Sequence, residues 1–237
     1  MRASNIFESL IASRKPHSAD AAVRTELTTL SPSMMADLQR FERNGRHTEV
    51  VEVMAASVRH SRSLSLKLEI DGERWPMMVL PRQRIVHGPL DLQALEEPAL
   101  RSIKVVQVEP VGARSMIRGQ ADRPREKYMT RPLGPLLWHL ALYGARSELL
   151  PEIHGPVSYR LAAGLALEGL AITPDLKPLL HRLRGRACRL DELCRSSAAS
   201  RERAHRLLNA LYLQSGLIVS RSQQDTPRFS LRRWFGD

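Results

Sequence analysis

Residues 190–221 read LDELCRSSAASRERAHRLLNALYLQSGLIVSR, and two apolar patterns flank a polar turn in this stretch. Before the turn, Leu190 and Leu193 lie on one side of a short helix. After the turn, Ser200 is placed to cap a helix over 201–214, because serine side chains accept a hydrogen bond from the first helical turn. The apolar side of this longer helix consists of Ala204, Leu207, Leu208 and Leu211.

The neighbouring segments extend the pattern in both directions. Pro174 stands at the start of an earlier helix that ends at Gly185, with Leu176, Leu179, Leu180 and Leu183 on its apolar side. After Gly216, which stops the longer helix, we expect a strand over 217–219, a loop and a returning strand over 228–234. The order over residues 173–235 is therefore helix, helix, turn, helix, hairpin.

This order and its residues resemble a bacterial winged helix-turn-helix domain. The resemblance covers about a quarter of the chain. The turn lacks the glycine common in this motif. The matching positions are Leu208, Leu211, Gly216, Leu217 and Ile218. In DNA-binding members of such a family, the third helix enters the major groove.

The resemblance implies a set of DNA-binding residues. On the third helix, Arg206 could pair with guanine and Asn209 with adenine, while His205 shares their side. Arg201 and Arg203 flank the start of this helix, where backbone amides also attract phosphate. The wing would add positive charge through Arg221, Arg228, Arg232 and Arg233. The open alternative is that this side of the helix is simply a solvated polar face.

The charge balance is compatible with such a partner. The chain of 237 residues has a formal net charge of +11, which favours polyanions. Of its 36 Lys and Arg residues only five are lysine, and the planar guanidinium of arginine binds phosphate oxygens better than the lysine ammonium does. The same skew arises from GC-rich coding sequence, so composition leaves both explanations open.

The N-terminal half predicts a separate α+β domain over 31–112, preceded by a loosely ordered arm over 1–30. A helix capped near Ser31 and a second one capped by Thr48 precede a strand that alternates from Leu64 to Ile70. Asp71-Gly72 is a strong hairpin signal, and Pro76 in the returning strand indicates an edge or bulge. A strand over 84–87, a helix over 90–100 and a strand over 103–108 complete a small, mainly antiparallel sheet.

The Arg-rich stretch 113–133 separates this domain from a helical region over 134–237. The stretch could bind a phosphorylated ligand, but its lack of apolar periodicity favours a solvated linker. Beyond it we expect helices over 136–143 and 148–153 and a connector over 161–170. The fold class is therefore α+β, with an N-terminal sheet and a C-terminal helical region ending in a winged helix.

Motifs for nucleotide binding and hydrolytic catalysis are absent from the sequence, and we expect no enzyme, cofactor or metal. Cys188 and Cys194 do not form a C-x-x-C motif, and two cysteines favour a reducing compartment. The run 132–145, which no other uncharged run exceeds in length, is shorter than the roughly 20 residues that cross a bilayer. We expect a cytoplasmic protein without integral membrane association.

Two functions remain open at this point. The first is a non-enzymatic regulator that binds duplex DNA through the C-terminal winged helix, with the N-terminal domain for sensing or for homodimer formation. The second is an adaptor in a bacterial signalling or surface-motility pathway, in which the winged helix binds a protein partner.

Overall fold

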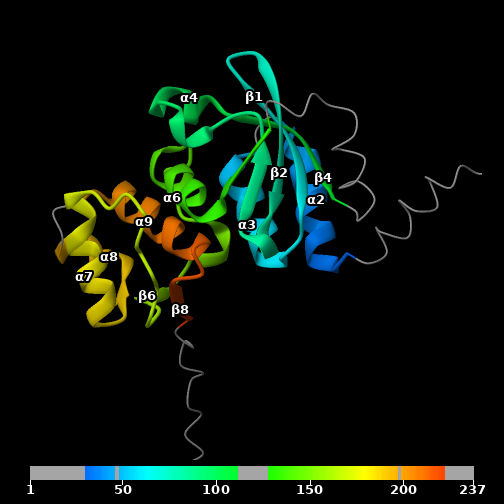
Figure 1. Cartoon of the computed structure of the whole chain (residues 1–237). Helices are drawn as coiled ribbons and strands as arrows, with labels where there is room; N and C mark the ends of the chain where they lie inside the picture. Colours follow the sequence, from blue (N-terminus) through cyan, green and yellow to red (C-terminus); the bar gives the residue numbers. More distant parts are fainter. Residues whose placement is uncertain (1–29, 46–47, 112–127, 197–198, 222–237) are drawn as a thin grey trace, which may run out of the picture.

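The computed structural model describes residues 30–45, 48–111, 128–196 and 199–221 (Figure 1). Its helices and two antiparallel sheets confirm the α+β class. A five-stranded sheet with two helices on one side forms the N-terminal part. A three-stranded sheet with three helices forms most of the C-terminal part.

Two helices open the described chain. In α2 (Pro32–Asn44), Ser31 Oγ accepts from the Met34 amide at 3.2 Å, which confirms the predicted cap. The helix ends at Gly45, whose φ of 51° suits glycine. The prediction that Thr48 caps the next helix is wrong. Helix α3 (Val50–His60) has Glu49 at its N-cap, and the buried Thr48 hydroxyl donates instead to Phe41 O at 3.1 Å.

The five-stranded sheet has the order β4-β1-β2-β3-β5. Its alternation is clearest in β1, where every second residue is buried, as the sequence pattern predicts. Asp71 and Gly72 have φ values of 51° and 83°, which confirms the hairpin turn between the first two strands. The strands are β1 (Leu64–Ile70), β2 (Glu73–Leu80), β3 (Ile85–Gly88), β4 (Lys104–Pro110) and β5 (Met129–Pro132).

Pro76 shows how a proline fits an interior strand. β2 lies between β1 and β3, but β3 pairs with it only from Met78 to Leu80. Pro76 pairs with Lys67 on β1 and lies beyond the β3 ladder. Its missing N–H therefore costs no hydrogen bond within that ladder, because β2 is an edge strand over residues 73–77.

The predicted domain boundary is partly wrong. Met129 to Pro132, assigned to the Arg-rich linker, form β5 and pair with β3, from Gly88↔Met129 to Ile85↔Pro132. The sheet is thus completed by residues that follow the linker, whose segment 112–127 lies outside the described residues. The predicted helix over 90–100 is divided into a 3-10 turn, η3 (Leu92–Ala94), and helix α4 (Glu97–Ser102).

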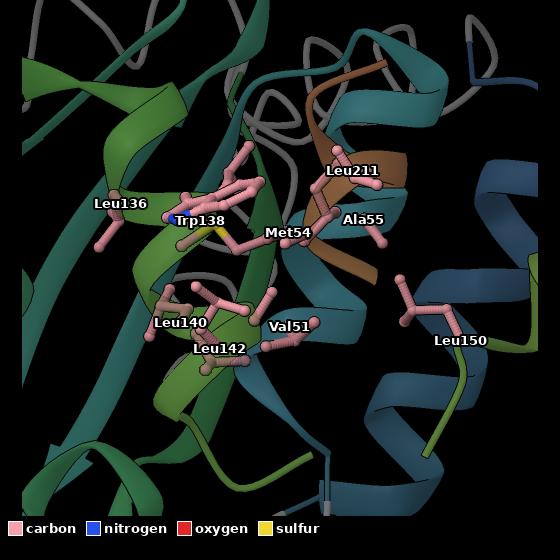
Figure 2. Close-up of a cluster of buried hydrophobic side chains, with 14 of the residues drawn as sticks. Val51, Met54, Ala55, Leu136, Trp138, Leu140, Leu142, Leu150 and Leu211 are labelled. Carbon is pink, nitrogen blue, oxygen red and sulfur yellow. The ribbon is translucent and has the colours of Figure 1, made fainter. Parts of the chain in front are cut away.

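Helix α6 (Leu133–Tyr143) joins the two parts. Most of its residues are buried, and it packs most extensively against α9 (Arg201–Leu213) while also contacting α3, α4, η3 and β3. Figure 2 shows Met54 of α3 pointing toward Trp138 of α6 within a single buried cluster. The two predicted domains therefore share one hydrophobic core.

The C-terminal part is built around an unpredicted strand. β6 (Val157–Leu161) lies between β7 (Cys188–Arg189) and β8 (Leu217–Arg221) in the three-stranded sheet. The predicted partner of β8, residues 228–234, lies outside the described residues. Three helices connect these strands: α7 (Lys177–Gly185), α8 (Leu190–Ser196) and α9, close to their predicted positions.

A predicted helix over 148–153 is a single 3-10 turn, η5 (Pro151–Ile153). Pro151 disfavours helical backbone at the preceding residue, and Leu150 is extended, with φ −60° and ψ 142°.

Polar contacts reinforce the junction between the two parts. Arg146 Nη1 lies 2.5 Å from Glu49 Oε2 and 2.7 Å from Glu52 Oε1, at the start of α3. Arg59 of α3 pairs with both Asp37 of α2 and Glu152 of η5. His60 Nε2 lies 2.8 Å from the same Asp37 carboxylate. Asp37 is thus the acidic centre of a network that spans α2, α3 and η5.

The shared core predicts a single unfolding unit. Met54→Ala removes a fully buried side chain between α3 and α6, which should cost about 3 kcal/mol of unfolding free energy. Hydrogen exchange should accelerate together in β1 and in α9. Faster exchange in only one of these two elements would contradict a common core.

The Asp37 network predicts an acid-dependent contribution to stability. Burial alone would raise the pKa of Asp37, but hydrogen bonds from His60 and Arg59 and the charges of Arg59 and Arg40 lower it below the ordinary 3.8. A depressed folded-state pKa stabilises the fold above the unfolded pKa, and that stability is lost as the pH falls through the folded value.

Asp37→Asn should therefore lower stability at pH 7 by about 1 kcal/mol, because the network is partly exposed. The difference from the parent chain should begin to shrink as the pH falls below 3.8 and should vanish once the pH is below the lowered folded-state pKa. Thermal melts of both chains across the acidic range check this. An equal difference at every pH would contradict it.

Candidate nucleic-acid interface

Helix α9 is the predicted DNA-reading helix, and its local structure follows the sequence. Ser200 Oγ accepts from the Arg203 amide at 3.1 Å, which confirms the predicted N-cap. The predicted apolar side is entirely buried: Ala204, Leu207, Leu208 and Leu211. The polar side is where the structure departs from the prediction.

Arg206 is not available to a base. Its side chain lies inside the protein, with only 4% of the residue exposed. Nη1 donates to Gly144 O at 2.8 Å and to Leu142 O at 3.3 Å, while Nε donates to Glu202 Oε1 at 2.9 Å. The guanidinium therefore satisfies carbonyls at the end of α6, where helical carbonyls lack partners and a positive charge is favourable. Its prediction as a guanine-binding residue is wrong.

Asn209 is equally internal, with no exposed surface. Its Oδ1 accepts from the Leu150 amide at 2.9 Å, and its Nδ2 donates to Glu148 O at 2.8 Å. The side chain thus holds the backbone of the segment that follows α6. Its prediction as an adenine-binding residue is wrong for the same reason: its donor and acceptor groups are both used within the fold.

Two further residues predicted to bind DNA, Arg203 and His205, make contacts within the protein. Arg203 Nε lies 2.6 Å from Asp175 Oδ2, Nη2 donates to Thr173 Oγ1 at 2.9 Å, and the guanidinium lies 5.7 Å from the Tyr143 ring centre. His205 Nδ1 donates to Ser147 O at 3.1 Å. Burial lowers the pKa of His205 below its ordinary 6.5, so it adds no charge at neutral pH.

What α9 presents to solvent is its first turn. Arg201 has 61% of its side chain exposed and lies 3.1 Å from Asp191 Oδ1, while the Glu202 side chain is 51% exposed. Arg221 is exposed at the end of β8. The other predicted wing residues, Arg228, Arg232 and Arg233, lie outside the described residues.

The charge of the chain is concentrated on this C-terminal part. Residues 30–111 contain eleven Lys and Arg residues and eleven Asp and Glu residues, which balance. Residues 174–221 contain ten basic and only four acidic residues, a net charge of +6. The helices α7 and α8 within this segment lie on the side of α9 away from the five-stranded sheet (Figure 1). The neutral and the basic parts are therefore at different ends of the molecule.

Each acidic residue of segment 174–221 has an arginine partner. Asp175 pairs with Arg203, Asp191 with Arg201, Glu192 with Arg186 and Glu202 with Arg206. The exposed cations left over lie on the outer side of α7, on α8 and on the strands: Lys177, Arg184, Arg189, Arg195 and Arg221. Arg160 on β6 is a further exposed cation.

Sequence reasoning missed Arg160 and Arg189, because the strand β6 was not expected. One signal was present: Val157, Tyr159 and Leu161 alternate with Ser158 and Arg160, and the structure buries the first three. That period-two pattern is typical of a half-buried strand.

The two cysteines are free thiols, and burial raises the pKa of both Cys188 and Cys194. Within the described ranges, no group of three or more His, Cys, Asp or Glu residues is arranged to hold a metal ion. None of the helices described is both long enough and apolar enough to cross a bilayer.

Comparison of the chain with protein-family models, with curated proteins and with solved structures finds no match.

The internal positions of Arg206 and Asn209 predict a stability effect. Arg206→Leu and Asn209→Leu each leave buried backbone groups unpaired and should each cost about 2 kcal/mol. Arg201→Leu, on the exposed first turn of the same helix, should change stability by less than about 0.5 kcal/mol. Urea unfolding of the three variants measures this. Equal stability of Arg206→Leu and Arg201→Leu would contradict the structural role.

Proposed function

We propose that this protein is a non-enzymatic regulator that binds duplex DNA through phosphate contacts of its basic C-terminal part. The observation that supports this most directly is the separation of charge: residues 174–221 carry +6, while residues 30–111 are neutral. Exposed cations held on one folded part attract the phosphate backbone and release its counterions, which supplies affinity without base contacts.

The proposal differs from the sequence-based hypothesis in how the DNA is read. Because Arg206 and Asn209 are engaged within the fold, the two side chains best suited to bidentate base contacts do not contribute. Positioning by phosphate contacts alone carries no direct sequence information. We therefore propose binding that tolerates different sequences.

The rest of the chain has a place in this proposal. The neutral five-stranded sheet would sense a signal or form a homodimer, and α6 connects it to α9 through a shared core. We propose a cytoplasmic location, since both cysteines are free thiols.

A second candidate is an adaptor that binds protein through its C-terminal part, in a bacterial signalling or surface-motility pathway. The burial of the predicted base-reading groups of α9 favours it, because a module without base contacts is equally suited to a protein partner. Its apolar contacts would respond weakly to salt, whereas DNA binding responds steeply.

The test is fluorescence anisotropy with two labelled duplexes of unrelated sequence across a salt series. We expect both to bind with dissociation constants within about three-fold of each other, and log K should fall linearly with log salt concentration. Lys67→Glu with Arg82→Glu, two exposed cations of the neutral part, is the control and should leave binding unchanged.

Failure to bind either duplex at low salt would exclude the DNA proposal, since non-specific attachment is strongest there. A preference of one hundred-fold or more for one duplex would contradict the proposal that bases are not read.

A further inference from the structure

The three-stranded sheet has one covered face and one open face. Val157, Tyr159 and Leu161 of β6 are buried toward the helices, so Ser158 and Arg160 point to the opposite side. Cys188 of β7, which pairs with Tyr159, is also buried. The open face therefore carries the alternate residues of all three strands.

The strand register sets the arrangement on this open face. Arg189 of β7 pairs with Ser158 of β6, and Ser158 pairs with Ser220 of β8, so these three side chains form one row. Arg160 pairs with Ile218 in the next row. Diagonal neighbours on one face of a sheet lie about 7–8 Å apart between Cα atoms, which places the two arginines within reach of one phosphate group or of adjacent ones.

The two arginines and two serines form a suitable set of anion ligands. Each guanidinium is a planar fork that matches phosphate oxygens, and serine hydroxyls donate to the same oxygens. Arg160, Arg189 and Ser220 are exposed, and Ser158 is half-buried. Ile218, with 46% of its surface exposed, lies beside Arg160 and adds an apolar contact.

The helical side of the same part is electrostatically different. Arg186, Arg201 and Arg203 on that side each pair with a carboxylate, while Lys177, Arg184 and Arg195 are exposed and form no ion pair within the described residues, so that side carries both signs of charge. Strands β6, β7 and β8 contain no Asp or Glu. Within the ranges that the structure describes, neither Arg160 nor Arg189 forms an ion pair. The positive potential of the sheet face is therefore uncompensated by neighbouring carboxylates in its own strands.

We infer that the open face of the three-stranded sheet, through Arg160, Arg189, Ser158 and Ser220, is the phosphate-binding surface of this protein. This inference rests on the proposed function and places the contact on the sheet, which faces away from the exposed side of α7. Helix α9 then serves as the internal support of the interface.

The experiment compares two matched pairs of substitutions in the full chain. Arg160→Gln with Arg189→Gln removes two charges from the sheet face. Lys177→Gln with Arg184→Gln removes two exposed charges from α7. Arg160→Lys with Arg189→Lys keeps the charge, and thermal melts verify that all three chains fold. Binding to a mixed-sequence duplex is measured by anisotropy across a salt series.

The glutamine pair on the sheet should reduce the salt slope of log K by about 2 and weaken binding roughly ten-fold at low salt, since each phosphate contact contributes about 0.9 to the slope. The lysine pair should keep the slope, and the α7 pair should leave it unchanged.

An unchanged slope for the sheet glutamine pair, or an equal loss for both glutamine pairs, would overturn the inference while leaving DNA binding itself intact. Absence of binding by the parent chain would instead remove the proposed function on which the inference rests.

Discussion

The packing of α9 against α6 is the contact on which the rest of this structure depends. α6 follows directly from the last strand of the five-stranded sheet, and α9 supplies its most extensive cover beside α3, α4, η3 and β3. The end of α6 leaves carbonyls without helical partners, and Arg206 reaches them. Asn209 then fixes the backbone that leaves the helix. Helix α9 has the residue spacing of a DNA-recognition helix, but its polar side chains Arg206 and Asn209 stabilise the fold instead.

This use of α9 has an electrostatic consequence for the surface. Its polar side chains are paired internally, and the carboxylates of segment 174–221 are paired with arginines of the helices. Within the described residues, the exposed cations of segment 174–221 that form no ion pair lie on the strands, on the outer side of α7 and, as Arg195, on α8. Arg160 and Arg189 come from segments 29 residues apart and meet only because β6 pairs with β7. Surface charge in this protein is therefore set by strand pairing as much as by composition.

Local patterns predicted the elements whose causes are local. The alternation of β1, the Asp71-Gly72 turn and the Ser200 cap each depend on a few neighbouring residues, and each is present in the structure. Periodicity also identified the apolar side of α9. It could not distinguish a polar side that faces water from one that faces the unpaired carbonyls of another helix, and Arg206 was misread for that reason.

Some strands whose pairing partners lie far along the chain were not predicted from the sequence. β5 and β6 are short strands whose hydrogen-bond partners lie far along the chain, so their few residues do not reveal which segments they pair with. The predicted end of the N-terminal domain, at residue 112, is wrong because β5 pairs with β3 after the Arg-rich stretch. The absence of a helix over 148–153 has a local cause, because Pro151 disfavours helical backbone at Leu150. The apolar periodicity around Pro151 nevertheless predicts a helix there.

Because β6 is the central strand of its sheet, the C-terminal part can form only after later segments of the chain have been synthesised. Its partner β8 is synthesised some 55 residues later, and α9, the cover of α6, only shortly before it. At translation rates of about 5–20 residues per second, α6 leaves the ribosome several seconds before its cover exists. Until then its apolar surface is open to chaperones and to other nascent chains. A message cut short before Arg201 would thus yield a sheet with an uncovered hydrophobic helix, a substrate for protein quality control.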